Sequence, residues 1–597
     1  MTRMRFFVMV ALVASLGTFW ELAQSQSGSK AASGEQQKPL VLRGGVLIDG
    51  NGGTPLRDAV VVISGNKIQS VGSQGAVTIP ADATVIDTSG KTILPGLFDS
   101  HVHFRNFHAP LYLYWGVTTV GDLGNPRGWI LDYRDAIAKG RAIGPYIVTS
   151  GPKLNQPLTP GAEPVPGDSL NYQTFQLGNS AGIFVTDQAS IEKGVLEAKK
   201  SGVDVIKLYM RMTPATMKLA ADAGHRAGYP VFAHFTSASS RRGIFLGTDE
   251  ILDTGIDVHV HLFGLVKTAA PKEIRDRIMR GEPVEAWHDL DTGKFPALVQ
   301  KMAEKKMALN PTLGAEFEKA SKHLAEFDRL NTSFVKGPIF ANLPEVIRNR
   351  YVPAFKPARG GREALEELEE GYQKVGLFVK QLVDRGGKVI AGADSGPFVK
   401  TPGLTLHMEM QMLNEVGLTP MQAIQAATNW GAEAWGKSKE FGTVEAGKRA
   451  DILILNRNPL EDLSATTDIS QVIQGGKVVD REGLAKWQET VPRPGAMQEG
   501  YPNAAIHVPF IDDVSPDSIP MNWKGGVELT ITGENFSNSS FVVMNDRLVP
   551  AKAHTEKELR IAVPSSLKKP GFYPFVVVNP GSAGGVSNTF YLIVTSN

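Results

Sequence analysis

The segment LPGLFDSHVH, residues 94–103, ends an apolar run of β type in the pair His101 and His103. Side chains two residues apart on a strand project from the same face, so both imidazoles are expected to point the same way at the end of this strand. Two imidazoles placed in this way can bind one metal ion. The pair alone is a weak signal, because two histidines in a strand are as often a packing or surface feature.

Four further polar residues each end a short apolar run of the same kind. Helix-like stretches closed by glycine precede most of these runs, as in residues 196–202 and 217–228. Alternating helices and buried strands predict a parallel α/β fold, and polar side chains at the carboxyl ends of the strands are typical of the active site of a (β/α)8 barrel. We therefore predict that the barrel brings the histidine pair together with Lys207, His234, His261 and Asp394.

Each of these residues has a structural alternative to a role in chemistry. A lysine that ends a buried strand is usually ion-paired or extends toward solvent, and Lys207 can bind a metal only if its amine is altered, as by reaction with CO2 to a carbamate. Asp394 can instead cap the helix that follows it. His259 and His261 form a second His-x-His pair. We expect His261 to be the ligand and His259 to lie one layer deeper in the barrel.

These segments resemble the amidohydrolase superfamily, in particular its imidazolonepropionase-like and Xaa-Pro-dipeptidase-like branch. The resemblance covers about residues 38–490 and rests on segments 94–103, 116–120, 206–209, 417–428 and 442–452. One departure is Val260, where many relatives carry glutamate. The resemblance implies a metal-dependent (β/α)8 TIM barrel with one or two zinc ions, or another divalent metal, held by His101, His103, a carbamylated Lys207 as bridging ligand, His234, His261 and Asp394.

The types of ligand suit hydrolysis by zinc. Imidazole and carboxylate groups bind zinc, and a chain without cysteine has no thiolate site. A bound ion lowers the pKa of water toward about 7, and a second ion bridged by the Lys207 carbamate would polarise the substrate carbonyl. Asp394 would carry the proton from the attacking water to the leaving group. Tyr209, two residues beyond Lys207, is expected on the same face, where it is either a substrate contact or an aromatic of the barrel rim.

The expected function is metal-dependent hydrolysis of amide, peptide or cyclic amide bonds in small molecules, with dipeptides as the leading substrates. A lactonase or another hydrolase of cyclic substrates is an alternative within the same fold, because fold does not fix function. The alternative from another class is a surface-binding protein whose barrel lacks catalysis. A metal-dependent turnover that disappears when Asp394 is changed distinguishes the enzyme from the binding protein.

The sequence on either side of the barrel, residues 93–440, has a different character. Residues 38–92 and 441–490 contain short β-type runs and tight turns, and we predict that together they form one small accessory β-sandwich. After a linker over 491–508, regularly spaced strands in residues 509–597 predict an immunoglobulin-like sandwich that resembles the IPT/TIG family. Such domains dock proteins or glycans, or act as spacers, so a protein or a glycan is a candidate partner.

The amino terminus predicts export. Two arginines precede an apolar stretch over residues 6–20, which is short for a membrane span of about 20 residues and typical of a signal peptide over residues 1–25. Residues 26–37 follow as a disordered linker. We expect a periplasmic or secreted protein without a stable membrane span after cleavage. The formal net charge of +1 in 597 residues, with no basic stripe, argues against nucleic acid as a partner.

Overall fold

The computed structural model describes most of the chain. It covers residues 38–105, 108–125, 127–140, 142–155, 182–185, 187–209, 212–235, 246–279, 286–337, 362–395, 401–484, 509–537, 540–544, 547–567, 569–578, 587 and 590–595. The expected signal peptide and the linkers expected over 26–37 and 491–508 lie outside these residues.

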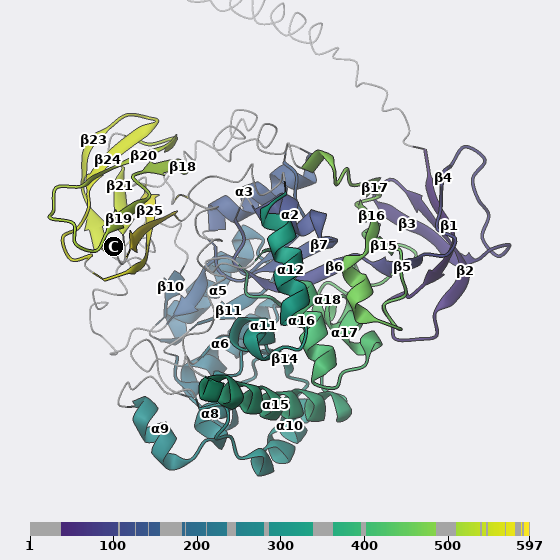
Figure 1. The fold of residues 1–597 in the computed structure, drawn as a ribbon, viewed down its shortest axis with the longest axis horizontal. Helices are drawn as coiled ribbons and strands as arrows, with labels where there is room; N and C mark the ends of the chain where they lie inside the picture. Colours follow the sequence, from purple (N-terminus) through teal and green to yellow (C-terminus); the bar gives the residue numbers. More distant parts are fainter. Residues whose placement is uncertain are drawn as a thin grey trace, which may run out of the picture.

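The two segments that flank the barrel in sequence form one β-sheet (Figure 1), of order β17-β16-β15-β5-β1-β2-β3, with β4 paired to β1 off this path. Antiparallel pairing of β5 with β15 joins the amino-terminal and carboxy-terminal segments, with Leu94 opposite Leu453. Val61 and Ile452 of this sheet are buried in a shared apolar cluster, which holds the two distant segments together. The strands are β1 (Leu40–Leu47), β2 (Leu56–Ser64), β3 (Lys67–Ser73), β4 (Thr84–Asp87), β5 (Thr92–Pro95), β15 (Ile452–Leu455), β16 (Ile469–Gln474) and β17 (Lys477–Val478).

The strands of the barrel are all parallel and follow one another in chain order. One sheet runs β6-β7-β8, and a second contains β9-β11-β12-β13-β14, with β10 on the outer side of β9. β8 pairs with β7 and β9 with β11, so these two strands form the two halves of one barrel position. The strands are β6 (Leu97–Val102), β7 (Val117–Asp122), β8 (Tyr146–Thr149), β9 (Lys153–Asn155), β10 (Gly182–Phe184), β11 (Ile206–Leu208), β12 (Val231–Ala233), β13 (Val258–Val260) and β14 (Ala308–Asn310).

Residues 388–395 close the circuit between β14 and β6 without forming a regular ladder. On the β14 side the N–H of Ile390 donates to the carbonyl of Leu309 at 2.8 Å, and on the β6 side the N–H of His103 donates to the carbonyl of Ser395 at 2.7 Å. Isolated parallel bridges accompany both contacts. The architecture is therefore the expected (β/α)8 barrel, with its last strand held by single bridges.

Capped helices connect the strands. α5 (Gln188–Ser201) begins after Asp187, which accepts a hydrogen bond from the N–H of Ser190 at 2.8 Å, and ends at Gly202 with φ 78°. α6 (Pro214–Ala227) ends in the same way at Gly228, with φ 87°. This left-handed backbone favours glycine, and it turns the chain back toward the next strand. The other helices near the barrel include α2 (Ala109–Tyr114), α3 (Arg127–Ala138), α7 (Thr248–Ile251), α8 (Phe263–Ala269), α9 (Lys272–Met279), α10 (Phe295–Glu304), α11 (Leu313–Glu316), α12 (Leu324–Val335), α15 (Arg362–Asp384), α16 (Leu404–Glu415), α17 (Pro420–Ala426) and α18 (Asn429–Ala434).

Apolar side chains fill the interior of the barrel. Phe98, Val205, Phe232, Val258 and Ile390 come from five strand positions and belong to one buried cluster. Each of them precedes, along its own strand, the polar residue predicted for the site. The apolar filling therefore lies on the amino-terminal side of the polar layer, and the polar layer lies toward the rim of the barrel.

The carboxy-terminal residues form two packed antiparallel sheets, as the alternating pattern predicts. One has the order β18-β20-β24-β23 and the other β19-β26-β25-β21-β22. The core residues between these two sheets belong to one apolar cluster that also contains Leu111, Leu113 and Phe334 of the barrel side. The strands are β18 (Phe510–Ser515), β19 (Ser518–Pro520), β20 (Glu528–Glu534), β21 (Phe541–Met544), β22 (Arg547–Val549), β23 (Ala551–His554), β24 (Glu558–Ala562), β25 (Gly571–Val578) and β26 (Phe590–Thr595).

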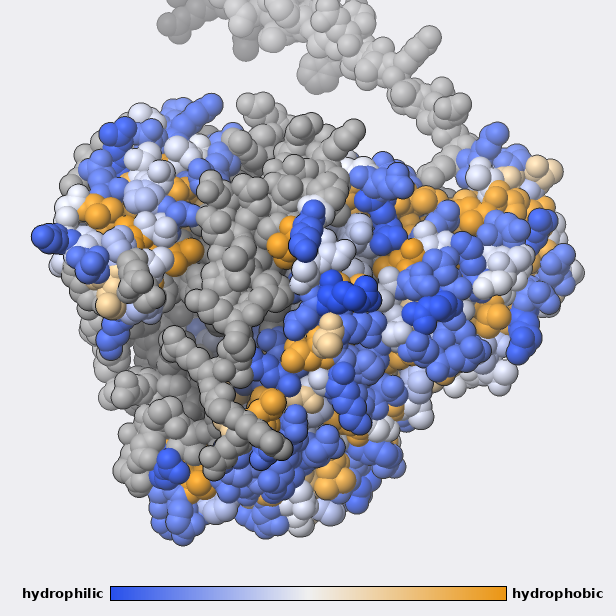
Figure 2. Space-filling model, viewed as in Figure 1, coloured by the Kyte–Doolittle hydropathy of each residue, from blue (hydrophilic) through white to orange (hydrophobic). Residues whose placement is uncertain are grey.

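The surface has a mixed character. On the face shown in Figure 2, hydrophobic residues lie in small groups that hydrophilic residues separate, which is ordinary for a surface in contact with water. Within the described ranges, none of the helices combines the length and the apolar composition that crossing a membrane requires.

Candidate metal centre

Two histidines and an aspartate meet where the first and last strands of the barrel end. His101 belongs to β6, His103 follows that strand, and Asp394 lies in the segment that bridges β14 and β6. Oδ1 of Asp394 lies 3.3 Å from Nε2 of His101 and 3.3 Å from Nε2 of His103. The His101 side chain is buried, whereas those of His103 and Asp394 are 21% and 18% exposed. The group therefore lies at the border between the core and solvent.

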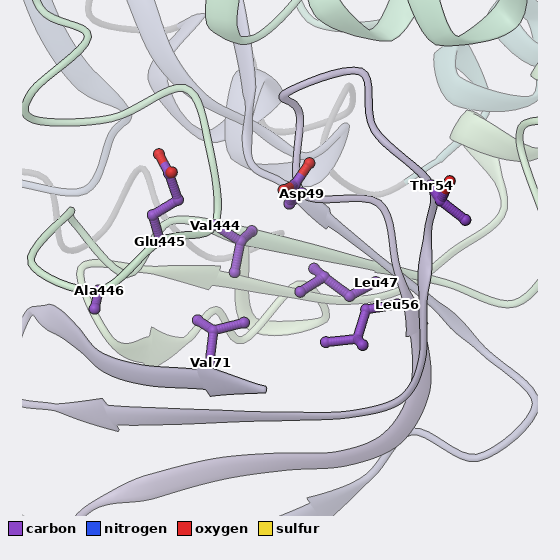
Figure 3. Close-up of a pocket in the computed structure, with 8 residues that line it drawn as sticks. All are labelled: Leu47, Asp49, Thr54, Leu56, Val71, Val444, Glu445 and Ala446. Atoms are coloured by element: carbon purple, nitrogen blue, oxygen red, sulfur yellow. The ribbon is translucent and has the colours of Figure 1, made fainter. Parts of the chain in front are cut away.

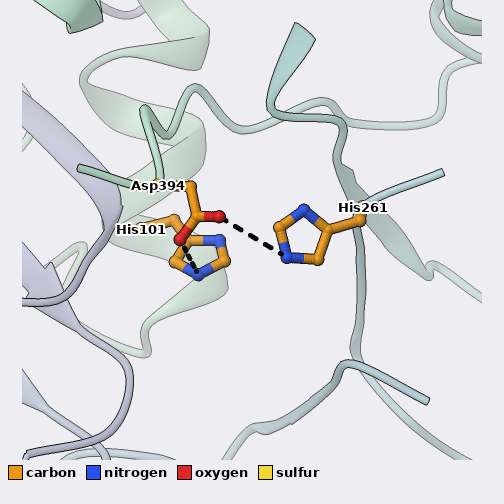
Figure 4. A group of neighbouring side chains, drawn as sticks. All are labelled: His101, His261 and Asp394. Carbon is orange, nitrogen blue, oxygen red and sulfur yellow. Dashed lines mark ion pairs between the residues drawn. The ribbon is translucent and has the colours of Figure 1, made fainter. Parts of the chain in front are cut away.

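Two further histidines reach this group from neighbouring strands. Figure 4 shows His261 beside His101 and Asp394, with its Nε2 4.0 Å from Oδ2 of Asp394. The ligand atoms of these three residues lie within 4.8 Å of one another. His234 follows β12, and its ring centroid lies 4.4 Å from that of His261. Four imidazoles from three strands and one carboxylate thus border the same space.

Lys207 and Tyr209 come to the same space from β11. Lys207 is buried, and its Nζ has no hydrogen-bond partner among the described residues. Nε2 of His234 is likewise buried without a partner in the described part of the chain. The ring centroid of Tyr209 lies 5.0 Å from that of His234. The structure thus places His101, His261 and Asp394 in the tightest group, with His103, His234 and Lys207 around it and Tyr209 at its edge.

Hydrogen bonds fix the orientation of two of the imidazoles. Oδ1 of Asn310 accepts from Nδ1 of His101 at 2.8 Å, and the amide of Asn310 donates to the carbonyl of Ile390 at 2.9 Å. Oγ1 of Thr312 lies 2.7 Å from Nδ1 of His261, and it donates its own hydrogen to the carbonyl of Pro311. Nδ1 therefore carries the proton in both rings, and Nε2 presents its lone pair to the shared space.

A buried carboxylate fixes the loop that carries Thr312. Glu409 on α16 accepts hydrogen bonds from the N–H groups of Leu313 at 2.9 Å and Gly314 at 2.7 Å. Thr312 directly precedes them and has φ 51°. Asp99 makes a similar tie nearer the centre, because its Oδ1 accepts from the N–H of Ala393 at 2.9 Å. None of these supporting roles was predicted from the sequence.

Burial sets the charge state of the site. It lowers the pKa of His101 and His234 well below 6.5 and that of His261 to about 4. Burial alone would raise the pKa of Asp394, but His101 and the other histidines around it hold that pKa well below 3.8. At neutral pH the centre therefore contains neutral imidazoles and an ionised carboxylate. This is the protonation state that metal ligands require.

Two of the candidate ligands have backbone angles that L-residues rarely adopt. The φ of His261 is 65° and that of Asp394 is 49°. A left-handed conformation costs a residue other than glycine roughly 1–2 kcal/mol, and such residues gather at functional sites. In both cases the unusual angle occurs at the carboxyl end of a barrel strand. At His261 it turns the side chain out of the alternation of the strand, since the preceding Val260 faces the barrel interior.

The prediction for His259 was wrong. Val258 and Val260 belong to the interior cluster of the barrel, so strand alternation directs His259 to the opposite face rather than to a deeper layer of the interior. There Nε2 of His259 lies 3.2 Å from Oγ1 of Thr248, and its ring centroid lies 4.8 Å from that of Phe235. The expectation failed because it placed His259 and His261 on one face, whereas the positive φ of His261 separates them.

A separate cavity lies in the accessory sheet (Figure 3). Its volume is about 340 Å³, and apolar side chains such as Leu47, Val71 and Val444 line it together with Asp49 and Glu445. Both carboxylates have partners within the sheet domain. Asn51 donates to Asp49, and Lys448 forms an ion pair with Glu445 at 2.8 Å. This cavity contains no group comparable with the histidine cluster.

The fold and the cluster define a class of protein: a (β/α)8 barrel enzyme with a histidine and aspartate centre at the carboxyl ends of its strands. Residues 112–479 match the amidohydrolase family, and residues 509–592 match the IPT/TIG domain. The chain therefore belongs to the amidohydrolase family, a family of hydrolases that act on carbon–nitrogen bonds, and ends in a TIG domain. The resemblance found in the sequence is confirmed.

Proteins with assigned activities are similar to this chain. The ochratoxinase of Aspergillus niger is 23% identical over 500 residues, which cover 78% of this chain and 91% of the relative. The enamidase of Eubacterium barkeri is 26% identical over 263 residues, 40% of this chain and 61% of the relative. The structure of a Xaa-Pro dipeptidase with bound methionine superposes with a TM-score of 0.50 at 20% identity, over 74% of this chain and all of that one (100%). This last likeness shows the shared fold.

Proposed function

We propose that this protein is an exported, metal-dependent amidohydrolase that cleaves amide or peptide bonds of small substrates, with dipeptides as the preferred class. One observation carries the proposal. The ligand atoms of His101, His261 and Asp394 lie within 4.8 Å of one another, and the buried amine of Lys207 has no partner among the described residues. A cluster this polar and this buried is costly for a protein unless it binds something.

The residues present fit a divalent metal. His101, His103, His234, His261 and Asp394 would hold it, and all of these donors are imidazole nitrogens or carboxylate oxygens, which suit zinc. The unpartnered Nε2 of His234 supports the same assignment, since a buried nitrogen with a free lone pair is stabilised by a cation. When bound, the ion supplies a Lewis acid that lowers the pKa of water toward about 7 and polarises the substrate carbonyl.

Lys207 fits the role of a carbamylated ligand. Burial lowers its pKa well below 10.5, and the nearby charge of Lys153 lowers it further. Burial thus favours the neutral amine, which can add to CO2 with release of one proton, and the resulting carbamate anion would be a bridging ligand if two ions bind. One or two ions are compatible with this set of donors.

Asp394 is the residue placed to move the proton. Its carboxylate is ionised and about one-fifth exposed, at 18%, so that it can meet both water and substrate. It accepts the proton of the attacking water and returns it to the nitrogen of the leaving amine. Its Oδ1 lies 3.3 Å from Nε2 of His101 and from Nε2 of His103, so the carboxylate would stay beside the metal ligands while the proton moves. Tyr209 at the edge of the group would contact the substrate.

The first experiment is hydrolysis of a dipeptide library by zinc-loaded protein. Asp394→Asn should abolish turnover, whereas the surface variant Asp222→Asn, whose native carboxylate only pairs with Lys218 on α6, should retain it. Turnover by wild type and by the surface variant alone supports a metallopeptidase. If none of the three proteins hydrolyses any dipeptide, the dipeptide proposal is wrong. Lactones and cyclic amides would then be tested as substrates, and a binding role after them.

We also propose that the enzyme is exported. The arginines and the apolar stretch at the amino terminus support cleavage near residue 25 and a periplasmic or secreted enzyme. Amino-terminal sequencing of the protein from each cell fraction tests this, and an intact residue 1 would contradict it.

The TIG domain would dock the enzyme to a protein or a glycan. Co-sedimentation of the full chain with envelope polysaccharide and protein fractions tests that role, and no retention on either would make the domain a spacer.

A further inference from the structure

Lys153 is a charged side chain beside the metal centre that the proposed chemistry does not use. It begins β9, whose Leu154 pairs with Leu208 of β11, so it lies next to the strand that carries Lys207 and Tyr209. Nζ of Lys153 lies 4.2 Å from the centre of the Tyr209 ring. The Tyr209 ring in turn lies beside His234, at 5.0 Å between ring centroids. The Tyr209 ring therefore contacts this cation as well as the candidate ligand His234.

The backbone around Lys153 leaves room for its side chain. A Cβ atom on Gly124 would lie 2.1 Å from Cε of Lys153, and Gly124 has φ 138°. Any other residue at this position would displace the lysine. The placement of the amine against Tyr209 is thus built into two neighbouring strand ends, β7 and β9, and is not the resting place of a loose surface chain.

No carboxylate in the described part of the chain forms an ion pair with Lys153. Asp122 and Asp394 favour its charged form electrostatically, but both carboxylates are engaged elsewhere. Oδ1 of Asp122 accepts from the N–H of Phe104 at 3.1 Å, and Oδ2 accepts from Oγ1 of Thr149 at 2.9 Å. Asp394 lies among the histidines. Burial lowers the pKa of Lys153 to about 8, so the amine remains mostly protonated at neutral pH.

A second cation reinforces the positive charge on this side of the site. Arg105 lies two residues after His103 and disfavours the charged form of Lys153, which places the two groups within electrostatic range. Its guanidinium donates to the carbonyl of Phe104 at 2.8 Å and to Oδ1 of Asn125 at 2.9 Å, and both acceptors are neutral. The space beside Tyr209 therefore has two cations nearby, and neither forms an ion pair with a carboxylate in the described part of the chain.

We propose that Lys153 binds a carboxylate of the substrate, so that the enzyme acts on amides whose leaving group is an amino acid with a free carboxylate, such as dipeptides and N-acyl amino acids. This inference rests on the proposed amidohydrolase function. A half-buried amine that pairs with none of the described carboxylates is unfavourable in the free enzyme, and a substrate carboxylate would supply the ion-pair partner. A charge-assisted hydrogen bond of this kind contributes about 1.5–3 kcal/mol, which corresponds to roughly 10- to 100-fold in affinity.

The test compares each dipeptide of the library with its C-terminal carboxamide, which differs only in the charge. For wild type we expect kcat/KM for the acid to exceed that for the carboxamide by about 10- to 100-fold. Lys153→Met should remove most of this ratio, mainly through a higher KM for the acid, and Lys153→Arg should restore part of it. Lys218→Met, at an exposed lysine of α6, should preserve the ratio.

The outcomes separate this inference from the proposed function. If wild type hydrolyses neither form, the proposed function is wrong. If wild type hydrolyses both forms equally, or if Lys153→Met keeps the preference for the acid, the function stands and the role of Lys153 is wrong. Metal content and thermal unfolding of each variant are measured in parallel. A loss of metal in Lys153→Met would instead make Lys153 the counter-ion of a carbamylated Lys207, which also overturns the proposal.

Discussion

The two His-x-His pairs of this chain share one sequence pattern and differ in structure. Both His101 and His103 place Nε2 at 3.3 Å from the same oxygen of Asp394. In the second pair only His261 reaches Asp394, whereas His259 contacts Thr248 on the opposite face of its strand. The pattern therefore identifies where ligands can occur, and the local backbone decides which histidine becomes one.

The backbone differs in a definable way. The pairing of β6 with β7 is irregular between Asp99 and Val102, and both histidines at the end of β6 turn toward the centre. β13 pairs regularly with β14 through Val260, and the chain leaves this alternation only at His261, with φ 65°. The regular strand β13 thus directs His259 away from the site, whereas the irregular backbone at the ends of β6 and β13 directs the other three histidines toward it.

The largest effect should come from replacing His261, the member of the second pair that we propose as a metal ligand. We expect His261→Asn to lower dipeptide turnover by at least about 10³-fold, because groups that act as one catalytic unit fail together. Its metal content, measured by elemental analysis, should fall as well. His259→Asn is the matched control and should retain its metal. Equal loss of metal in both variants would show that the two pairs do not differ as the geometry indicates.

A pH dependence of stability should come from a buried histidine outside the candidate metal centre. His407 on α16 has hydrogen bonds to the carbonyl of Trp115 and to Thr466, and burial lowers its pKa from 6.5 to about 4. Between these values the unfolded chain binds a proton that the native chain does not. The free energy of unfolding should therefore fall as pH drops from about 6.5 to 4, by up to about 3 kcal/mol.

The comparison that isolates His407 uses the variant His407→Gln. Denaturant unfolding of both proteins is measured from pH 4 to 7.5 with a chelator present, so that metal binding does not contribute to the slope. The variant should show a shallower dependence on pH across this window. Parallel curves for the two proteins would contradict the assignment of this proton to His407.

A smaller effect, on metal affinity, should follow when His261 loses its hydrogen bond to Thr312. Thr312→Val removes the oxygen that accepts from Nδ1 of His261, and changes of this kind typically weaken metal affinity by about 10- to 100-fold. Competition with a chelator of known affinity measures the change. Thr332→Val, at an exposed position of α12, should leave the affinity unaltered. If the two variants bind metal equally well, the orientation of His261 does not depend on Thr312.

The smallest effect should be on stability. His259→Asn should lower the free energy of unfolding of the metal-free protein by about 1–2 kcal/mol, since it removes a buried ring and its contact with Thr248. Denaturant unfolding of wild type and variant measures the difference. A much larger loss would mean that His259 holds more of the barrel than these contacts indicate.

Much of the architecture could be predicted because parallel strands place their carboxyl ends at one rim. The repeated pattern of short apolar runs, each ending in a polar residue, was enough to predict that His101, Lys207, His234 and Asp394 lie at the same end of the barrel. Helix stops at Gly202 and Gly228 could be identified because a left-handed helix end favours glycine. These signals are local, and a local signal can be read along the chain.

The supports of the site were beyond the same reasoning. Asn310 and His101 are 209 residues apart, and Glu409 and Leu313 are 96 apart. Nothing in either neighbourhood marks the partner, because an asparagine or a buried glutamate suits many contacts. The position of His259 was misjudged for a related reason, since the sign of one φ angle decides it. Lys153 was not predicted, because the sequence does not show that it lies beside Tyr209 without an ion pair to any of the described carboxylates.

The left-handed backbone at His261 and Asp394 has a consequence for how this protein can change. Glycine would adopt both backbone conformations with less strain, so selection for stability alone gives no reason to keep histidine and aspartate at these angles. A lineage released from selection for turnover would be free to exchange them. Any attempt to evolve a more robust form of this enzyme should therefore screen for hydrolysis at every round, because backbone strain lies at the two proposed ligands.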